Sequence, residues 1–131
     1  MHLGMTIYIH NTLDAVEFYQ KAFGLTMGYN EKFPDGTYMH AELQRDGKTV
    51  FAVCDTKSDE VAVTLQKLAK KGRFPISSMA LDFDTEEEVS QAFEMLREEG
   101  VVRRPPGPLP WNSYSTDVLD KYGVYWYLYV K

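Results

Sequence analysis

The sequence contains a histidine and a glutamate two positions apart, His40 and Glu42, whose side chains can transfer protons. Residues 38–44 alternate between polar and apolar side chains, which is typical of a β-strand and predicts that His40 and Glu42 share its polar face. Adjacent imidazole and carboxylate groups can act as general acid and base, and burial would raise the pKa of the carboxylate towards neutrality. We interpret His40 and Glu42 as candidate catalytic residues. The alternative is a strand with polar residues on a wet face.

Four further side chains are candidates for substrate binding: Tyr8, His10, Trp111 and Tyr127. Tyrosine rings can stack on a planar ligand or hydrogen-bond to it, although they also fill space. His10 ends the first predicted strand and otherwise only precedes a helix. Trp111 follows a proline-rich segment, and it either closes over a ligand or anchors that segment on the core.

Two other features are expected to have no catalytic role. Cys54 ends a predicted strand, and neither a neighbour that would lower its pKa nor a Cys–His signature accompanies it, so we do not expect a nucleophile. Glu86, Glu87 and Glu88 lie in the first turn of a predicted helix, where carboxylates favour the positive end of the helix dipole.

The elements that position these residues occur twice. An alternating stretch, residues 5–10, leads into an amphipathic helix, residues 11–23, which Asn11 or Thr12 can cap and Gly24 closes. A second stretch, residues 77–84, leads into a helix over 85–99, with a Thr85–Glu88 capping box and Gly100 at its end. The predicted strands that follow the two helices are 25–33, 38–44 and 48–53, and then 101–103, 114–119 and 124–130.

Two segments stand outside this repeat. Residues 105–110 contain four prolines, which predicts a rigid loop that cannot join a sheet. Residues 55–75 are expected to connect the two halves, with a short helix ending near Gly72; an extended conformation over 61–64 is the alternative.

Composition limits the class of protein. The chain has 131 residues, 44% of them hydrophobic and 25% charged, as expected for one globular domain. The net charge of -5 disfavours nucleic acid as a partner, and no apolar run reaches the roughly 18 residues that span a membrane. The N-terminal residues lack the pattern of a signal peptide, and the single cysteine cannot form an internal disulfide, so a cytoplasmic location is expected.

Several motifs in this order resemble one known family. They are Ala-Val-Glu-Phe-Tyr-Gln-Lys-Ala-Phe-Gly at 15–24, Pro-Asp-Gly at 34–36, Met-His-Ala-Glu-Leu at 39–43, and residues 111–128 with Asp-Lys-Tyr-Gly-Val-Tyr-Trp at 120–126. Over nearly the whole chain they resemble the vicinal oxygen chelate superfamily of glyoxalases, bleomycin and fosfomycin resistance proteins and ring-cleaving dioxygenases, and in particular its PhnB-like branch.

The resemblance implies an α+β fold in which two βαβββ modules form one cup-shaped mixed sheet with helices on the outer face. The single domain, 1–131, would consist of module one at 1–54, a connector at 55–75 and module two at 76–131. A homodimer is also implied.

The resemblance further implies where metal ligands would stand. The three positions fall on Gly4, on Ser77 or Ser78, and on Tyr127, none of which offers the imidazole or carboxylate that a divalent ion prefers. We therefore expect no metal at the usual site and no other cofactor. No glycine-rich nucleotide-binding loop is present, so we discount the methyltransferase name that some PhnB-like proteins carry.

Three functional hypotheses remain. The first is a protein that binds a small aromatic or amphipathic metabolite without a metal. An enzyme is favoured over a simple binder, and its reaction is unassigned. The residues expected to line its pocket are Tyr8, His40, Glu42, Trp111 and Tyr127. The second is a binding-only protein that sequesters an antibiotic or toxin; such relatives hold cationic ligands in an acidic groove, and the negative net charge is compatible with this. The third is a metal-dependent lyase or dioxygenase with ligands displaced to His10, His40 and Glu42.

Overall fold

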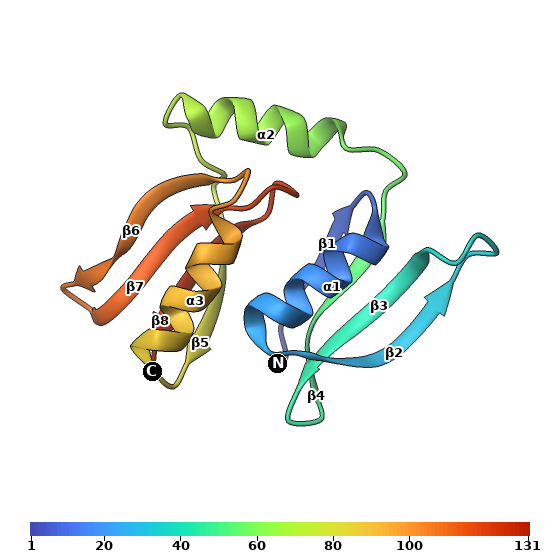
Figure 1. Ribbon diagram of the computed structural model, residues 1–131, viewed down its shortest axis with the longest axis horizontal. Helices are drawn as coiled ribbons and strands as arrows, with labels where there is room; N and C mark the ends of the chain where they lie inside the picture. The colour runs from blue at the N-terminus through green and yellow to red at the C-terminus, as the bar shows by residue number, and fades with distance from the viewer. The chain divides into compact units, whose positions relative to one another are not determined.

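The computed structural model describes all 131 residues, which form two compact units, Met1–Asp59 and Glu60–Lys131. Each unit contains a four-stranded mixed sheet with one helix packed on one of its faces (Figure 1). The chain order of the first unit is strand, helix and three strands, and the second unit has the same order after one additional helix at its start. The predicted α+β class with two βαβββ modules is therefore confirmed.

The first unit contains five elements. They are β1 (Thr6–Ile9), α1 (Thr12–Phe23), β2 (Thr26–Lys32), β3 (Tyr38–Arg45) and β4 (Lys48–Asp55). The strand order is β1-β4-β3-β2; β1 runs parallel to β4, and the other neighbours are antiparallel.

Alternation along the strands builds the core of the first unit. Ile7 on β1 and Leu43 on β3 are buried, whereas the polar side chains beside them in sequence point to the opposite face. Tyr19 of α1 is fully buried and its ring lies edge-on to that of Phe51, with 5.6 Å between centroids. Gly24 ends α1 with φ 66°, as predicted, and its N–H donates to the carbonyl of Gln20. One face of the sheet is therefore packed against α1. No element of the first unit covers the opposite face of the sheet.

The second unit contains six elements. They are α2 (Glu60–Lys70), β5 (Met79–Phe83), α3 (Glu86–Leu96), β6 (Val101–Leu109), β7 (Asn112–Leu119) and β8 (Tyr125–Val130). The strand order is β5-β8-β7-β6, with β5 parallel to β8, so the pairing pattern of the first unit is repeated.

Helix α2 confirms the short helix expected in the connecting segment, and the extended alternative was wrong. Ala69 belongs to a buried cluster with Leu119 and Tyr125, against which Leu65 packs. The Gln66 side chain donates to the backbone carbonyl of Lys121 at 2.7 Å. The helix therefore belongs structurally to the second unit.

The proline-rich segment does join a sheet, so that prediction was wrong. Strand β6 runs through Pro105, Pro106 and Pro108 and pairs with β7. It lies at the edge of its sheet, where N–H groups on one side need no partner, and its register shifts on both sides of Gly107. An edge position with an irregular register accommodates prolines that a central strand would exclude.

The helix ends agree only partly with expectation. Thr85 accepts a hydrogen bond from the N–H of Glu88 at 3.1 Å, as the predicted capping box requires. Asn11 instead adopts a left-handed conformation, and its amide donates to Asp14 rather than capping the backbone.

Gly100 does not close α3 by conformational freedom, because the positive φ of 58° belongs to Glu99. A Cβ on Gly100 would lie 2.5 Å from the carbonyl oxygen of Leu119, so this glycine permits a close backbone approach.

A buried aspartate fixes the turn between β7 and β8. Asp120 is 0% exposed, and one of its oxygens accepts from the N–H groups of Tyr122 and Val124 at 2.9 and 3.0 Å. Its other oxygen accepts from the indole N–H of Trp126 at 2.8 Å. These bonds set the conformation from which β8 begins.

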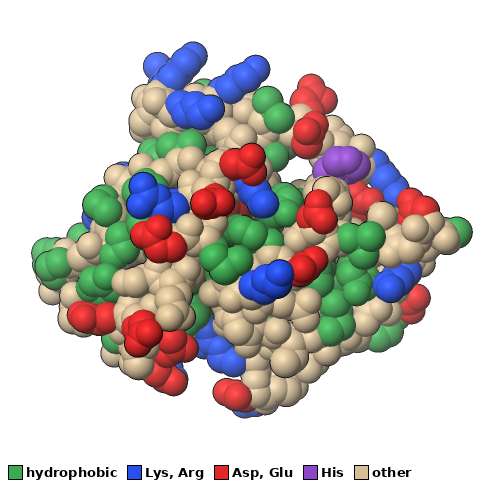
Figure 2. Space-filling model, in the orientation of Figure 1, with side chains coloured by type: hydrophobic (Ala, Val, Ile, Leu, Met, Phe, Trp, Pro, Cys, Tyr) green, Lys and Arg blue, Asp and Glu red, His purple; other side chains and the backbone are tan.

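The surface carries mixed charge. Figure 2 shows acidic and basic side chains over most of the visible face, with several basic side chains together at its upper left. None of the three helices is long enough and apolar enough to cross a lipid bilayer.

Candidate functional site

His40 and Glu42 lie in contact on the face of the first sheet that α1 leaves uncovered. The imidazole Nε2 of His40 is 3.1 Å from a carboxylate oxygen of Glu42, and both side chains are about one-third exposed (32% and 30%). Glu42 also accepts a hydrogen bond from the hydroxyl of Thr49 at 3.0 Å. The strand alternation thus brings the predicted pair within hydrogen-bonding distance.

Cys54 completes this group, although the sequence carries no Cys–His signature. Its sulfur lies 3.3 Å from Nδ1 of His40, because His40 and Cys54 are directly paired across β3 and β4. The imidazole therefore bridges a thiol on one nitrogen and a carboxylate on the other. Burial raises the pKa of the Cys54 thiol, so the resting group is protonated at neutral pH.

The pKa of Glu42 is shifted in the direction opposite to the expectation. The hydrogen bond with His40, and then the one from Thr49, lower it below its usual value. The carboxylate is not enclosed in a dry site, so desolvation does not dominate. Glu42 is ionised at neutral pH and accepts hydrogen bonds there rather than donating a proton.

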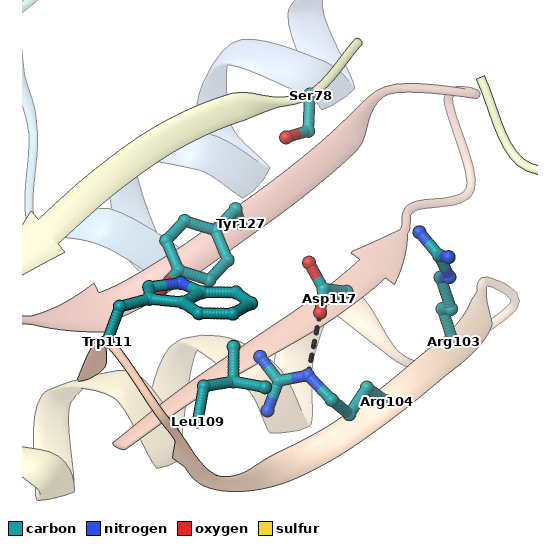
Figure 3. Close-up of a pocket in the computed structure, with 7 residues that line it drawn as sticks. All are labelled: Ser78, Arg103, Arg104, Leu109, Trp111, Asp117 and Tyr127. Carbon is teal, nitrogen blue, oxygen red and sulfur yellow. Dashed lines mark hydrogen bonds and ion pairs between the residues drawn. The ribbon is translucent and has the colours of Figure 1, made fainter. Parts of the chain in front are cut away.

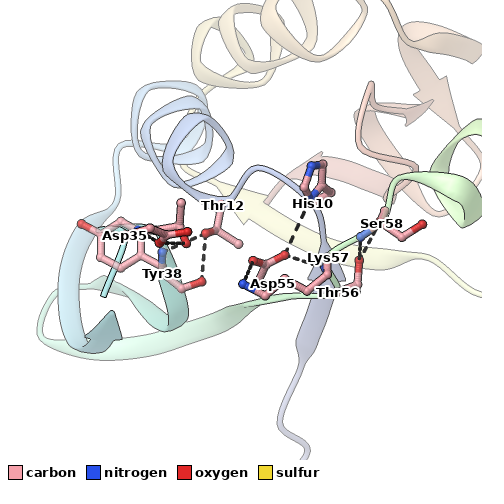
Figure 4. A network of polar contacts seen from close by, with 9 residues as sticks. His10, Thr12, Asp35, Tyr38, Asp55, Thr56, Lys57 and Ser58 are labelled. Carbon is pink, nitrogen blue, oxygen red and sulfur yellow. Dashed lines mark hydrogen bonds and ion pairs between the residues drawn. The ribbon is translucent and has the colours of Figure 1, made fainter. Parts of the chain in front are cut away.

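The other two candidates of the first unit differ in their position relative to this group. Tyr8 is paired with Cys54 across β1 and β4, and it is 68% exposed. His10 follows β1, and its Nδ1 lies 3.8 Å from Asp55, which is also 3.2 Å from the ammonium of Lys57 (Figure 4). The structure brings Tyr8 next to the Cys54–His40–Glu42 group and places His10 in a separate ion-pair network.

The second unit contains a pocket of about 560 Å³ on the sheet face opposite α3, within the range of small-molecule sites. Its lining residues are Ser78, Arg103, Arg104, Leu109, Trp111, Asp117 and Tyr127 (Figure 3). Trp111, at the turn between β6 and β7, is 74% exposed, so it does not anchor that segment on the core. The two predicted aromatic residues of this unit therefore line one pocket.

An ion pair forms the polar wall of the pocket. Nε of Arg104 donates to Asp117 at 2.8 Å, with side chains only 25% and 19% exposed. The terminal nitrogens of Arg104 donate to the hydroxyl and the carbonyl of Ser115 at 2.7 and 2.9 Å. The guanidinium is thus held in one orientation, as a preorganised polar contact requires.

Sequence reasoning missed this ion pair, and the repeat offers a signal that could have found it. Glu42 pairs with Ala52 across β3 and β4, and Asp117 pairs with Tyr127 across β7 and β8. When the buried residues of the two modules are aligned, these carboxylates occupy equivalent positions, each on the face away from the module's own helix. Arg104 had no such signal, because its pairing depends on the shifted register of β6.

The residues at the expected metal positions do not fit a metal. Ser78 and Tyr127 both line the pocket, but they supply a hydroxyl and a phenol, and Gly4 supplies no side chain. No group of three or more His, Cys, Asp or Glu side chains in the chain is arranged to hold an ion. The displaced set is not assembled either: His40 contacts Glu42, whereas His10 contacts Asp55.

Comparison with known proteins assigns this architecture to a family. The model of the glyoxalase/bleomycin resistance protein/dioxygenase superfamily matches residues 2–128. The chain belongs to this superfamily. The match covers both modules and all the candidate residues, so the resemblance seen in the sequence is confirmed. No protein of curated function matches the chain.

Solved structures of the superfamily share the whole fold. A PhnB protein from Bacillus cereus, whose name also gives 3-demethylubiquinone-9 3-methyltransferase, is 22% identical with a TM-score of 0.74, and 100% of each chain is covered. TioX from Micromonospora sp. ML1 is 16% identical with a TM-score of 0.64, covering 100% of this chain and 96% of that one. A glyoxalase/bleomycin resistance protein/dioxygenase family enzyme from Burkholderia phytofirmans is 19% identical with a TM-score of 0.61, covering 96% and 94%. At these identities the likeness shows the fold alone.

Proposed function

We propose that the second unit binds a small planar molecule with a neutral or anionic polar group, without a metal. The observation that supports this most strongly is the pocket in which Trp111 and Tyr127 accompany a fixed arginine–aspartate pair. Aromatic walls with a few oriented polar groups are typical of small-molecule sites.

Unused hydrogen-bonding groups support a ligand of this kind. The indole N–H of Trp111, the hydroxyl of Tyr127 and the hydroxyl of Ser78 have no hydrogen-bond partner within the protein. Rings can contact a planar ligand face-on while these groups meet its polar edge. The pocket therefore offers both apolar area and directional contacts.

The charge of the pocket favours a neutral or anionic ligand over a cation. Two arginines line it against one aspartate, and that aspartate is already paired with Arg104. A cationic ligand would lack a free carboxylate partner there. This argues against the acidic-groove form of antibiotic sequestration, although the chain as a whole carries -5.

A thermal-shift screen with matched ligands tests the proposal. Planar aromatic carboxylates and the corresponding aromatic amines of equal size are compared, since a bound ligand stabilises the protein by RT ln(1 + [L]/Kd). We expect carboxylates to raise the melting temperature more than amines, and Trp111→Ala to remove the shift. Leu13→Ala, at an exposed position of the first unit, is the matched control and should retain it. Hits that stabilise Trp111→Ala as much as the wild type would contradict the proposal.

Catalysis is proposed separately for the first unit, where His40 and Glu42 remain our candidates for acid–base chemistry. Their contact and the ionised state of Glu42 support a base rather than an acid role for the carboxylate. Incubation of each hit with wild type and with Glu42→Gln, followed by mass spectrometry of the products, separates an enzyme from a binding protein. Turnover lost in Glu42→Gln supports an enzyme, and unchanged ligand with both proteins supports binding alone.

We also propose a homodimer in the cytoplasm, which the superfamily resemblance and the single cysteine support. Light scattering during size-exclusion chromatography would measure twice the monomer mass of 15.1 kDa. A monomer at micromolar concentration would contradict the dimer.

A further inference from the structure

The first unit carries a thiol, an imidazole and a carboxylate in one chain of contacts. Sγ of Cys54 lies 3.3 Å from Nδ1 of His40, and Nε2 of the same ring lies 3.1 Å from Glu42. A nucleophile that contacts a base, with the base oriented by a third group, is the arrangement that activates thiols and hydroxyls for covalent chemistry. The pocket of the second unit includes none of these three residues.

The carboxylate determines which nitrogen of His40 carries the proton. Glu42 is ionised because its hydrogen bonds with His40 and Thr49 lower its pKa, so it can only accept a hydrogen bond. Nε2 of a neutral His40 is therefore protonated, and the lone pair of Nδ1 points at the thiol of Cys54. In this tautomer His40 is placed to take the thiol proton.

The surroundings of the imidazole are aromatic and acidic. Glu31 pairs with His40 across β2 and β3, and the ring of Tyr29, which is hydrogen-bonded to Glu31, lies 6.1 Å from the imidazole. With Tyr8 beside Cys54 on β1, these are the titratable groups that face His40 and its two partners from the other strands. No arginine or lysine contacts the three residues. An anionic reagent would meet Glu31 and Glu42 there, whereas an uncharged one would meet tyrosine rings.

We propose that Cys54 is a nucleophile, with His40 as its base and Glu42 as the residue that positions the base, and that it captures small uncharged electrophiles with an activated carbon–carbon double bond. His40 takes the proton from sulfur as the sulfur–carbon bond forms at the β-carbon. The electrons of the double bond move to the carbonyl as an enolate, and His40 returns the proton to the α-carbon. The S–H group has then added across the double bond, and no oxidant, reductant or further reactant is needed.

The reaction can be followed without ambiguity, because Cys54 is the only cysteine of the chain. The full-length protein is treated with N-ethylmaleimide, and the rate of adduct formation is measured by intact mass spectrometry from about pH 5 to 9, the range that spans imidazole and thiol titration. The same protein unfolded in concentrated urea gives the rate of the unassisted thiol.

We expect the folded protein to react at least about tenfold faster than the unfolded chain at neutral pH, since general-base assistance typically contributes 10²–10⁴-fold. His40→Ala and His40→Gln should both lose this advantage, and Glu42→Gln should lose part of it. His2→Ala, which removes another histidine from an exposed position, is the matched control and should react like the wild type.

Two measurements on the wild type alone test the role of Cys54 even if a variant fails to fold. The rate should already be well above that of the unfolded chain at neutral pH, rather than rising only with thiol ionisation above about pH 8. Relative to 2-mercaptoethanol, N-ethylmaleimide should react faster than the anionic 3-maleimidopropionate.

The proposal that Cys54 is an activated nucleophile would be overturned by a reaction rate that rises only with thiol ionisation. It would also be overturned if the folded protein reacted no faster than the unfolded chain. Equal relative rates for the two maleimides would overturn the preference for uncharged electrophiles. Because Trp111 and Tyr127 take no part, the outcome is independent of ligand binding in the second unit.

Discussion

The buried carboxylate of Asp120 should control the stability of the second unit. Asp120→Asn keeps one oxygen for the N–H groups of Tyr122 and Val124, but it directs an amide NH2 at the indole N–H of Trp126. Two donors then face each other at a site that is 0% exposed. A hydrogen bond to a charged group contributes about 1.5–3 kcal/mol and an unpaired buried donor costs about 1–3 kcal/mol. We expect the free energy of unfolding to fall by about 2–4 kcal/mol.

Urea unfolding followed by near-ultraviolet circular dichroism measures this loss. A double-mutant cycle with Trp126→Phe should give a coupling energy of about 1.5–3 kcal/mol, because the two side chains share the 2.8 Å bond. Asp84→Asn is the matched control: its side chain is 79% exposed and lies 3.8 Å from Lys131, so its loss should be below about 0.5 kcal/mol. An Asp120→Asn variant within about 0.5 kcal/mol of the wild type would mean that the carboxylate does not stabilise this turn.

Three further predictions concern single side chains, each measured by urea unfolding. Thr85→Ala removes the cap of α3 and should cost about 1 kcal/mol, whereas no loss would mean that the bond to the backbone is not formed in solution. Because the pKa of Glu42 is lowered, its contribution to stability is complete above its ordinary value of about 4–5 and is lost as pH falls through the folded-state value. Glu42→Gln should therefore make stability less dependent on pH in acid, and an unchanged acid limb would contradict this. Gly123→Ala should be more costly than Gly36→Ala: both have positive φ (84° and 89°), but only at Gly123 would the new Cβ lie 2.8 Å from Ala62. Equal losses would contradict the close approach.

Much of the fold was predictable because local signals agreed with the packing. Alternation placed Ile7 and Leu43 on the buried face, and the stripe of α1 placed Tyr19 against the same sheet. Thr85 was identified as a cap from its spacing to Glu88. In each case the deciding interaction lies within a few residues or follows directly from the period of the element.

Features that depend on register between strands were not predictable. A uniform hairpin continuing the pairing of Arg45 with Lys48 would set His40 opposite Val53, but a register shift between Leu43 and Gln44 sets it opposite Cys54. The contact between Cys54 and His40 therefore depends on one register shift, which no pattern of residues in the sequence predicts. The pairing of Arg104 with Asp117 depends in the same way on the irregular edge strand.

The candidate residues were predicted by type and face, but their environments were not. Trp111 and Tyr127 do line one pocket, because alternation and the position of the turn are local properties. The pKa direction of Glu42 was wrong because it depends on how exposed the carboxylate is and on the hydroxyl of Thr49, which lies on the neighbouring strand.

The two tryptophans of the chain allow ligand binding in the pocket of the second unit to be observed residue by residue. Trp111 is 74% exposed in the pocket, whereas Trp126 is 1% exposed and bonded to Asp120, so their indole N–H groups should give two distinct signals in a ¹H–¹⁵N spectrum. Trp111→Phe assigns them by removing one. On titration with an aromatic carboxylate that stabilises the protein, we expect the Trp111 signal to move and the Trp126 signal to stay. A stabilising ligand that leaves the Trp111 signal unchanged at saturation would show that it does not bind in the pocket of the second unit.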